Sequence, residues 1–211
     1  DDMIGSFALS NSTTPKPERK ETVKFTWQEQ LKKGSDLIKK GKLYAGLNLI
    51  REATEENEDN IELKYQYALS LISGGEDNEA AQSELEKVIS LDPNHLDSYL
   101  QLSKLAEIKR DYLLGKSYLE KALEIDQKNA DLYYKLGVLT TTKFPDLQDQ
   151  AANYFKLSIK IDDSNPNAHY RYGLILDEHL KKPKKAMRQF EITKELQNDY
   201  PFVSYDLALM H

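Results

Sequence analysis

The feature that most constrains the fold is a pair of apolar stripes that recurs with a period near 34 residues. One copy runs from Leu96 to Asn129, where apolar and small residues recur every three to four positions on both sides of Arg110-Asp111. That spacing puts them on one face of each of two helices, and the charged dipeptide between them is a polar turn. The unit is therefore a helical hairpin with one apolar seam, too small to bury that seam alone.

The same pattern recurs before and after this unit. A small or β-branched side chain closes the second helix of each copy, and these positions are Ala53, Val88, Ala122, Ser158 and Thr193. Their spacings are 35, 34, 36 and 35 residues, and the 36-residue step coincides with a longer turn around Pro145. Five units with a nearly fixed period predict a stack in which each hairpin packs only on its neighbours.

The pattern resembles the tetratricopeptide repeat (TPR) family, whose paired helices follow a 34-residue period. No unit has the family's tryptophan, and only one has its closing proline. The matching residues are Tyr133, Leu136, Gly137, Ala151 and Phe155 in the fourth unit, with Ala122 and Pro93 at their own places. The resemblance implies an all-α fold, a right-handed α-solenoid of about five helical hairpins plus a C-terminal helix.

We expect an N-terminal tail followed by one solenoid domain. Residues 1–25 mix Ser, Thr, Pro and Lys without a helical period, which predicts a disordered or extended tail. A short apolar cluster between Met3 and Leu9 is a candidate docking segment, for another protein or for this protein's own groove. The solenoid covers 26–211, with units at about 27–60, 62–95, 96–129, 130–165 and 166–199, then a capping or truncated helix over 200–211.

Composition excludes several classes of function. A net charge of −6 opposes a general nucleic-acid role, because binding phosphates requires a cationic surface. The chain has no cysteine, so it can form neither a disulfide nor a thiolate metal site. No apolar run approaches the ~20 residues of a membrane-spanning helix. We therefore expect a soluble protein, with the cytoplasm favoured over the periplasm or an organelle.

No arrangement of residues predicts catalysis. The histidines lack the spacing of a zinc site, and we expect His169 to be a packing residue and His95 and His179 to be solvated near turns. The pair Gly74-Gly75 lacks the Lys-Ser/Thr that completes a phosphate-binding loop. No nucleophile lies beside a recognisable base. We expect no catalytic residue, no metal and no cofactor, and therefore a protein that is not an enzyme.

The resemblance points instead to a concave groove lined by the first helix of each hairpin. The residues that the register places in this groove are Tyr67, Gln101, Lys104, Tyr134, Lys135, Tyr170 and Arg171. The C-terminal half of the groove therefore gathers three cations and two tyrosines on an otherwise acidic protein. Lysine and arginine attract carboxylates, and tyrosine offers apolar area with one hydrogen bond. The partner that we expect is another protein or peptide with acidic character.

Two interpretations of these cations stay open. They could bind a partner, or they could neutralise the nearby carboxylates Asp131, Asp177 and Glu178. The carboxylate clamp of chaperone-binding domains in this family is not expected, since both of its asparagines are missing.

The favoured function is a non-catalytic protein–protein interaction module, a scaffold or adaptor that binds a partner segment in the groove. The alternative is structural self-assembly through the apolar C-terminal helix, and helical-repeat RNA binding is less favoured.

Overall fold

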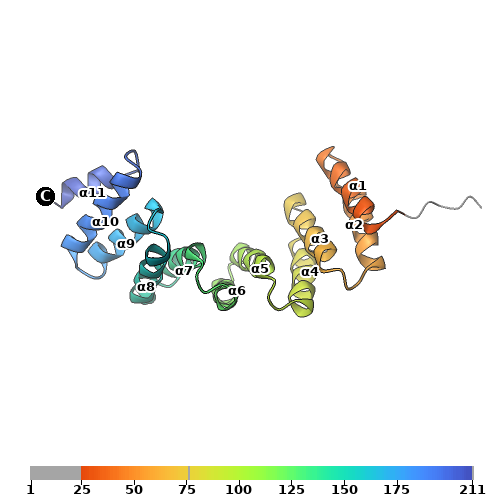
Figure 1. The fold of residues 1–211 in the computed structure, drawn as a ribbon, viewed down its shortest axis with the longest axis horizontal. Coiled ribbons are helices and arrows are strands. Elements are labelled where there is room, and N and C mark those ends of the chain that lie inside the picture. Colours follow the sequence, from red (N-terminus) through yellow and green to blue (C-terminus); the bar gives the residue numbers. More distant parts are fainter. Residues whose placement is uncertain (1–24, 76, 211) are drawn as a thin grey trace, which may run out of the picture.

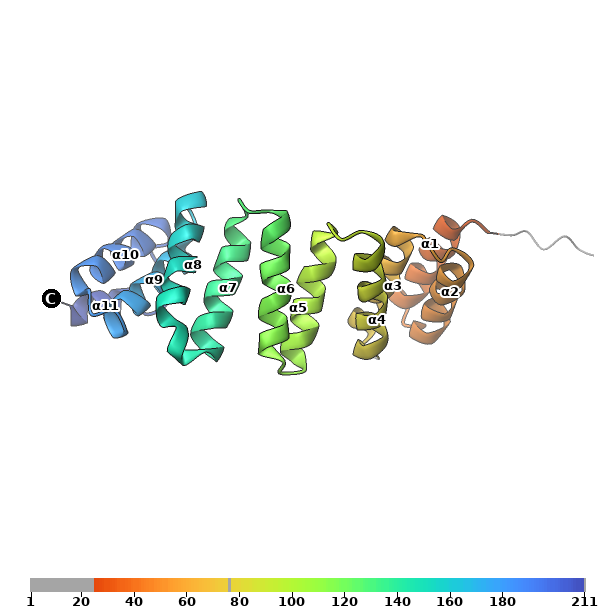
Figure 2. The same cartoon turned by 90° about the horizontal axis from the view of Figure 1, so that it is seen from below.

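The computed structural model describes residues 25–75 and 77–210, and all regular secondary structure in that part of the chain is helical. The helices pair into five hairpins followed by one short helix, so the predicted all-α solenoid is confirmed. Figure 1 shows the hairpins in one elongated, open arc, and Figure 2 shows them standing side by side. The helices are α1 Trp27–Lys39, α2 Leu43–Glu56, α3 Ile61–Gly74, α4 Asn78–Leu91, α5 Leu96–Ile108, α6 Tyr112–Ile125, α7 Ala130–Lys143, α8 Gln148–Ile161, α9 Pro166–Glu178, α10 Pro183–Leu196 and α11 Val203–Leu209.

Polar residues fix where most of the helices begin. Helix α1 starts with a capping box, in which the Thr26 side chain accepts from the backbone N–H of Glu29 and the Glu29 carboxylate accepts from the backbone N–H of Thr26. Such caps satisfy N–H groups that have no partner inside the helix. The other caps with an Asn or Asp side chain are Asn60, Asp77, Asp111, Asn129 and Asn165.

The fourth hairpin has a longer turn than the others. A short 3-10 helix, η1 Pro145–Leu147, lies between α7 and α8. Pro145 occupies the first position of η1, where its missing N–H has little cost. This insertion explains the 36-residue spacing, and it leaves the apolar face of α8 in register with those of the neighbouring second helices.

The core depends on a close approach between the two helices of each hairpin. In the fourth and fifth hairpins, a fully buried phenylalanine of the second helix lies against a glycine of the first. A Cβ atom added to Gly137 would lie 2.8 Å from the Phe155 ring, and one added to Gly173 would lie 2.5 Å from the Phe190 ring. Neither position has room for a side chain, so the glycines are required by packing.

The third hairpin makes the same approach with a different pair. Here the glycine is on the second helix, and the buried Ser103 of the first helix donates a hydrogen bond of 2.9 Å to the Gly115 carbonyl. A Cβ atom added to Gly115 would lie 3.3 Å from the Ser103 carbonyl oxygen. The constraint therefore belongs to the pair of helices rather than to one residue.

The C-terminal helix is shorter than the segment 200–211 in which the sequence predicted it. Helix α11 begins after Phe202, which has a left-handed backbone with φ of 67°. Val203 is buried against the last hairpin, but the side chains of Phe202, Tyr205 and Leu209 are 73%, 63% and 68% exposed. The helix therefore packs on the end of the array through Val203, Leu207 and Met210 and leaves an apolar surface open.

The packing predicts a rescue between two substitutions. We expect Gly173→Ala to lower the free energy of unfolding by about 1–3 kcal/mol, because the new methyl group must displace the Phe190 ring. Adding Phe190→Leu should recover most of that loss, since Leu85 and Leu119 occupy the same position in the second and third hairpins. Urea unfolding measures both effects. Losses that simply add in the double variant would contradict the packing account.

Candidate functional site

A cavity of about 290 Å³ opens between α5 and α7, the first helices of the third and fourth hairpins. In Figure 1 these helices lie on the inner side of the arc, while α6 and α8 lie on its outer side. We call it the α5–α7 cavity. Its lining consists of Leu100, Ser103, Lys104, Glu107, Leu119, Tyr134, Lys135, Val138, Leu139 and Thr142.

Two lysines give one part of the α5–α7 cavity a positive charge. Burial lowers the pKa of Lys135, and the neighbouring charge of Lys104 lowers that pKa further. Asp131 forms an ion pair with Lys135 one helical turn away, so the neutralisation interpretation is correct for this residue. Lys104 forms no ion pair with any described residue. The ammonium groups therefore raise each other's energy, and a carboxylate placed between them would relieve that repulsion.

Apolar side chains and a tyrosine form the rest of the α5–α7 cavity. Leu119 and Leu139 are buried and form its floor, and Leu100 and Val138 are partly exposed along its walls. The Tyr134 ring packs against Phe155 with centroids 5.9 Å apart. The Tyr134 hydroxyl forms no hydrogen bond with another described residue, so it is available to a ligand. The cavity thus offers a cationic end, a hydrogen-bonding hydroxyl and an apolar floor.

Two of the predicted groove residues, Tyr67 and Gln101, belong to contacts inside the array. Tyr67 is buried in a core cluster that extends from the first hairpin to α5, so it is not available in a groove. Burial raises the pKa of Tyr67, and the nearby Arg51 of α2 opposes that shift. Gln101 is half-buried and forms a side-chain hydrogen bond with Tyr65 of α3.

Tyr170, the next predicted groove residue, lies one hairpin beyond the α5–α7 cavity. Its hydroxyl donates a 2.9 Å hydrogen bond to Asp206 of α11, and its ring packs on Tyr200 with centroids 4.9 Å apart. Tyr170 therefore anchors the C-terminal helix rather than lining an open groove.

Arg171 is beside Tyr170 and also outside the α5–α7 cavity. It is half-buried and forms no ion pair with Asp177 or Glu178. The interpretation that the groove cations neutralise nearby carboxylates is therefore wrong for Arg171. Of the seven predicted groove residues, the structure thus brings three together and leaves the other four apart. The three are Lys104, Tyr134 and Lys135.

The histidines show where the expectation for isolated polar residues succeeds and where it fails. His169 is 3% exposed and bonds to the Gln189 side chain at 2.7 Å and the Asp163 carbonyl at 3.0 Å, which confirms its packing role. His179 is exposed as expected.

The expectation for His95 is wrong. This histidine is half-buried and packs on Tyr65 with ring centroids 4.8 Å apart. It also caps α5, because its ring nitrogen accepts from the Ser98 N–H. A histidine at the start of a helix can therefore replace the Asn or Asp that caps five of the other described helices.

Residues 25–75 and 77–210 contain no cluster of three or more His, Asp or Glu side chains that could hold a metal ion. None of the described helices combines the length and the apolar character needed to cross a membrane. The remaining polar feature of interest is a buried charge pair at the N-terminal end of the array.

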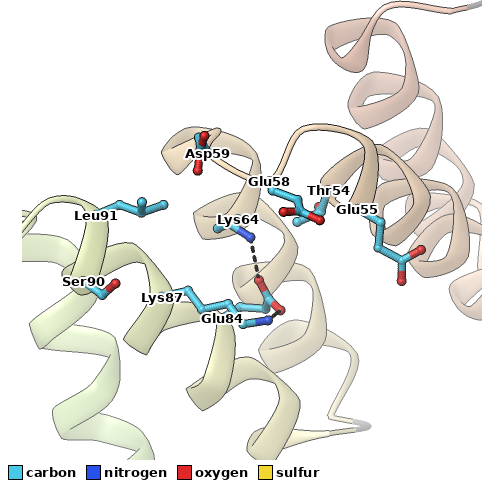
Figure 3. Close-up of a pocket in the computed structure, with 9 residues that line it drawn as sticks. All are labelled: Thr54, Glu55, Glu58, Asp59, Lys64, Glu84, Lys87, Ser90 and Leu91. Atoms are coloured by element: carbon cyan, nitrogen blue, oxygen red, sulfur yellow. Dashed lines mark hydrogen bonds and ion pairs between the residues drawn. The ribbon is translucent and has the colours of Figure 1, made fainter.

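Sequence reasoning missed this second crevice, which we call the α2–α4 crevice (Figure 3). It measures about 360 Å³ and lies between α2, the start of α3, and α4. The Lys64 ammonium is 3.8 Å from Glu84 Oε2, and the Lys87 ammonium is 2.7 Å from Glu84 Oε1. The side chains of Lys64 and Glu84 are only 9% and 12% exposed. The sequence does contain a signal for the crevice, because Lys64 occupies an inward position in the apolar stripe of α3.

The sequence of the second and third hairpins identifies the repeat. Residues 61–95 and 96–129 each match the family model of the tetratricopeptide repeat. Residues 61–129 therefore carry two tetratricopeptide repeats. The two TPR matches coincide with the hairpins α3–α4 and α5–α6, and the other three hairpins share their two-helix architecture. A search of curated proteins finds no match to the chain.

Solved TPR structures share the fold at low sequence identity. The MamA fragment from Desulfovibrio magneticus RS-1 has a TM-score of 0.68 at 18% identity, covering 85% of this chain and 99% of that one. YrrB, described as a TPR protein with an unusual peptide-binding site, has a TM-score of 0.66 at 16% identity, covering 84% and 89%. TTC0263 from Thermus thermophilus has a TM-score of 0.52 at 19% identity, covering 87% and 98%. At these identities the likeness concerns the fold.

The buried charge pair of the α2–α4 crevice predicts opposite outcomes for single and double substitution. Glu84→Gln leaves the Lys64 charge uncompensated, so we expect it to lower the free energy of unfolding by about 2–3 kcal/mol. The double variant Lys64→Leu/Glu84→Tyr copies the fourth hairpin, which has Leu132 and Tyr154 at these positions, and should be neutral or more stable. Thermal and urea unfolding measure both. A double variant as unstable as the single one would mean that the array needs the charges for packing.

Proposed function

We propose that this TPR array is a protein–protein interaction module that binds an acidic peptide segment of a partner in the α5–α7 cavity. The observation that supports this most is the meeting of Lys104, Lys135 and Tyr134 above an apolar floor on the inner side of the arc. TPR arrays are built from neighbour contacts alone, which leaves a long inner surface free for partners.

The chemistry of the α5–α7 cavity defines the ligand in two parts. Burial and, to a smaller extent, repulsion from Lys104 lower the Lys135 pKa, and an Asp or Glu side chain between the two ammonium groups would offset that repulsion. An apolar side chain beside it would fill the space between Leu100 and Val138, above Leu119. The preferred motif is therefore an acidic residue close to a Leu, Ile or Phe in an extended or helical segment.

The Asp131–Lys135 ion pair competes only weakly with such a ligand. The Asp131 side chain is 63% exposed, and the two residues are one turn apart on the surface of α7. Exposed pairs of this kind contribute about 0.3–0.5 kcal/mol, so a better-buried carboxylate can replace Asp131. The pair therefore does not block the cationic end of the cavity.

The proposed module does its work by binding and has no catalytic step. Among the residues that line the α5–α7 cavity there is no histidine or cysteine, and the single carboxylate is Glu107. Burial raises the pKa of Glu107, and the charge of Lys143 opposes the shift. No hydroxyl of the described cavity lining forms a hydrogen bond with this carboxylate, so no nucleophile is paired with a base.

Selection from a displayed peptide library tests the proposed function. Peptides selected on the wild-type protein should pair Asp or Glu with an apolar residue. We expect Lys104→Glu/Lys135→Glu to weaken their binding by about 10- to 100-fold, because two attractive contacts become repulsive. The control Lys156→Glu/Lys160→Glu makes the same charge change on exposed residues of α8 and should stay within about twofold. Isothermal titration calorimetry measures the affinities.

Two outcomes would contradict the proposed function. Equal binding of the selected peptides by the cavity variant would remove the site from the α5–α7 cavity. The competing function is self-assembly through the exposed apolar side chains Phe202, Tyr205 and Leu209. A sedimentation coefficient that rises with protein concentration and falls back in Leu209→Asp, without any peptide selected, would favour assembly instead.

A further inference from the structure

The α2–α4 crevice contains charges that the fold itself does not require. Lys64 and Glu84 occupy positions that other hairpins fill with uncharged side chains, although those positions are buried or half-buried throughout. The residues equivalent to Lys64 are Ser98, Leu132 and Ala168, and those equivalent to Glu84 are Tyr118, Tyr154 and Gln189. Because uncharged residues suffice to stack hairpins elsewhere in this chain, a buried charge pair at one place indicates a use other than packing.

The polar atoms of this pair are incompletely satisfied. The Lys64 side chain is about nine-tenths buried, and its ammonium group has one ion pair at 3.8 Å and no hydrogen bond with a described residue. Glu84 Oε2 is buried and also has no hydrogen-bond partner among the described residues. Figure 3 shows Lys64 and Glu84 extending toward each other in the crevice wall. A buried carboxylate oxygen without a donor is costly, so a ligand that donates to Glu84 and accepts from the largely buried Lys64 would be bound favourably.

The rim of the α2–α4 crevice has the opposite charge. Glu58 and Asp59, in the connection between α2 and α3, are exposed and form no ion pair with a described residue. Glu55 at the end of α2 is paired only with Arg51, 3.4 Å away on the same helix. Four carboxylates and two ammonium groups line the crevice, for a net charge of −2. A matching ligand carries an excess of two positive charges and also offers acceptors.

The chain itself contains such a segment. Residues 16–24 read KPERKETVK, with four basic and two acidic side chains and therefore a net charge of +2. The segment directly precedes Phe25, close to the start of α1. Because α1 and α2 form an antiparallel hairpin, the start of α1 lies beside the end of α2, where residues between Thr54 and Asp59 line the crevice.

The length of the segment is sufficient. Arg19 is six residues before Phe25, and six residues reach about 20 Å when extended. Packed helices lie about 8–10 Å apart from axis to axis, so the start of α1 is one to two helix spacings from the crevice. Arg19 and Lys20 can therefore reach the rim without any change in the helices. Tethering also gives the segment a millimolar effective concentration, so weak contacts are enough.

We propose that the α2–α4 crevice binds the segment 16–24 of this same chain. Arg19 and Lys20 pair with the rim carboxylates of Glu58 and Asp59. Backbone carbonyls of the segment accept hydrogen bonds from Lys64. This site is separate from the α5–α7 cavity and independent of the function proposed for it.

Paramagnetic relaxation measures this contact directly, because the chain has no cysteine and one introduced thiol is the only labelling site. A nitroxide on Thr14→Cys should broaden the amide signals of Asp59, Lys64 and Glu84 in the 211-residue chain. We expect Glu58→Lys/Asp59→Lys to reduce that broadening by at least half. Glu191→Lys/Glu195→Lys makes the same charge change on exposed residues of α10 and should leave the broadening unchanged.

The remaining outcomes overturn the proposal. Amide signals of the crevice that stay sharp, or broadening that Glu58→Lys/Asp59→Lys leaves intact, mean that segment 16–24 does not bind there. A mixture of spin-labelled chain with isotope-labelled chain that lacks the nitroxide separates the two sources of the segment. Broadening in that mixture at equal strength would assign the crevice to the tail of a second copy and exclude the contact within one chain.

Discussion

The close approach of the two helices in each hairpin is the constraint on which the rest of the structure depends. Phe155 and Phe190 are fully buried because glycine faces them, and a single added methyl group would collide with either ring. The tight hairpins set the spacing at which first helices line up on the inner side of the arc. Lys104 on α5 and Lys135 on α7 share one cavity because of that spacing.

Charge is distributed over this scaffold in two different ways. In the α5–α7 cavity two like charges lie close together, and burial and repulsion lower the pKa of Lys135. In the α2–α4 crevice opposite charges are buried together, with an oxygen of Glu84 left without a hydrogen bond from any described residue. Both arrangements cost free energy in the isolated chain, and both would be relieved by the charged segments that we propose as ligands. Interaction is therefore the function that the electrostatics and the TPR fold support together.

Much of the fold could be predicted from the sequence, because a period near 34 residues admits few structures. The repeat register also correctly predicted that Lys104, Tyr134 and Lys135 lie on one surface. It could not predict that apolar neighbours bury Tyr67 or that Tyr170 binds Asp206 of α11. Pattern reading treats charged residues as solvated, and so it missed Lys64. The late start of α11 depends on the left-handed backbone of Phe202, which no periodicity reveals.

The most direct test of the proposed site is the pKa of Lys135. NMR of the Lys135 side chain measures that pKa with and without a bound acidic peptide. We predict a pKa below the ordinary lysine value in the free protein, because burial and Lys104 disfavour the charged form. A bound carboxylate stabilises the protonated form, so the same pKa should rise when the peptide binds. A Lys135 pKa that the peptide leaves unchanged would contradict the proposed site.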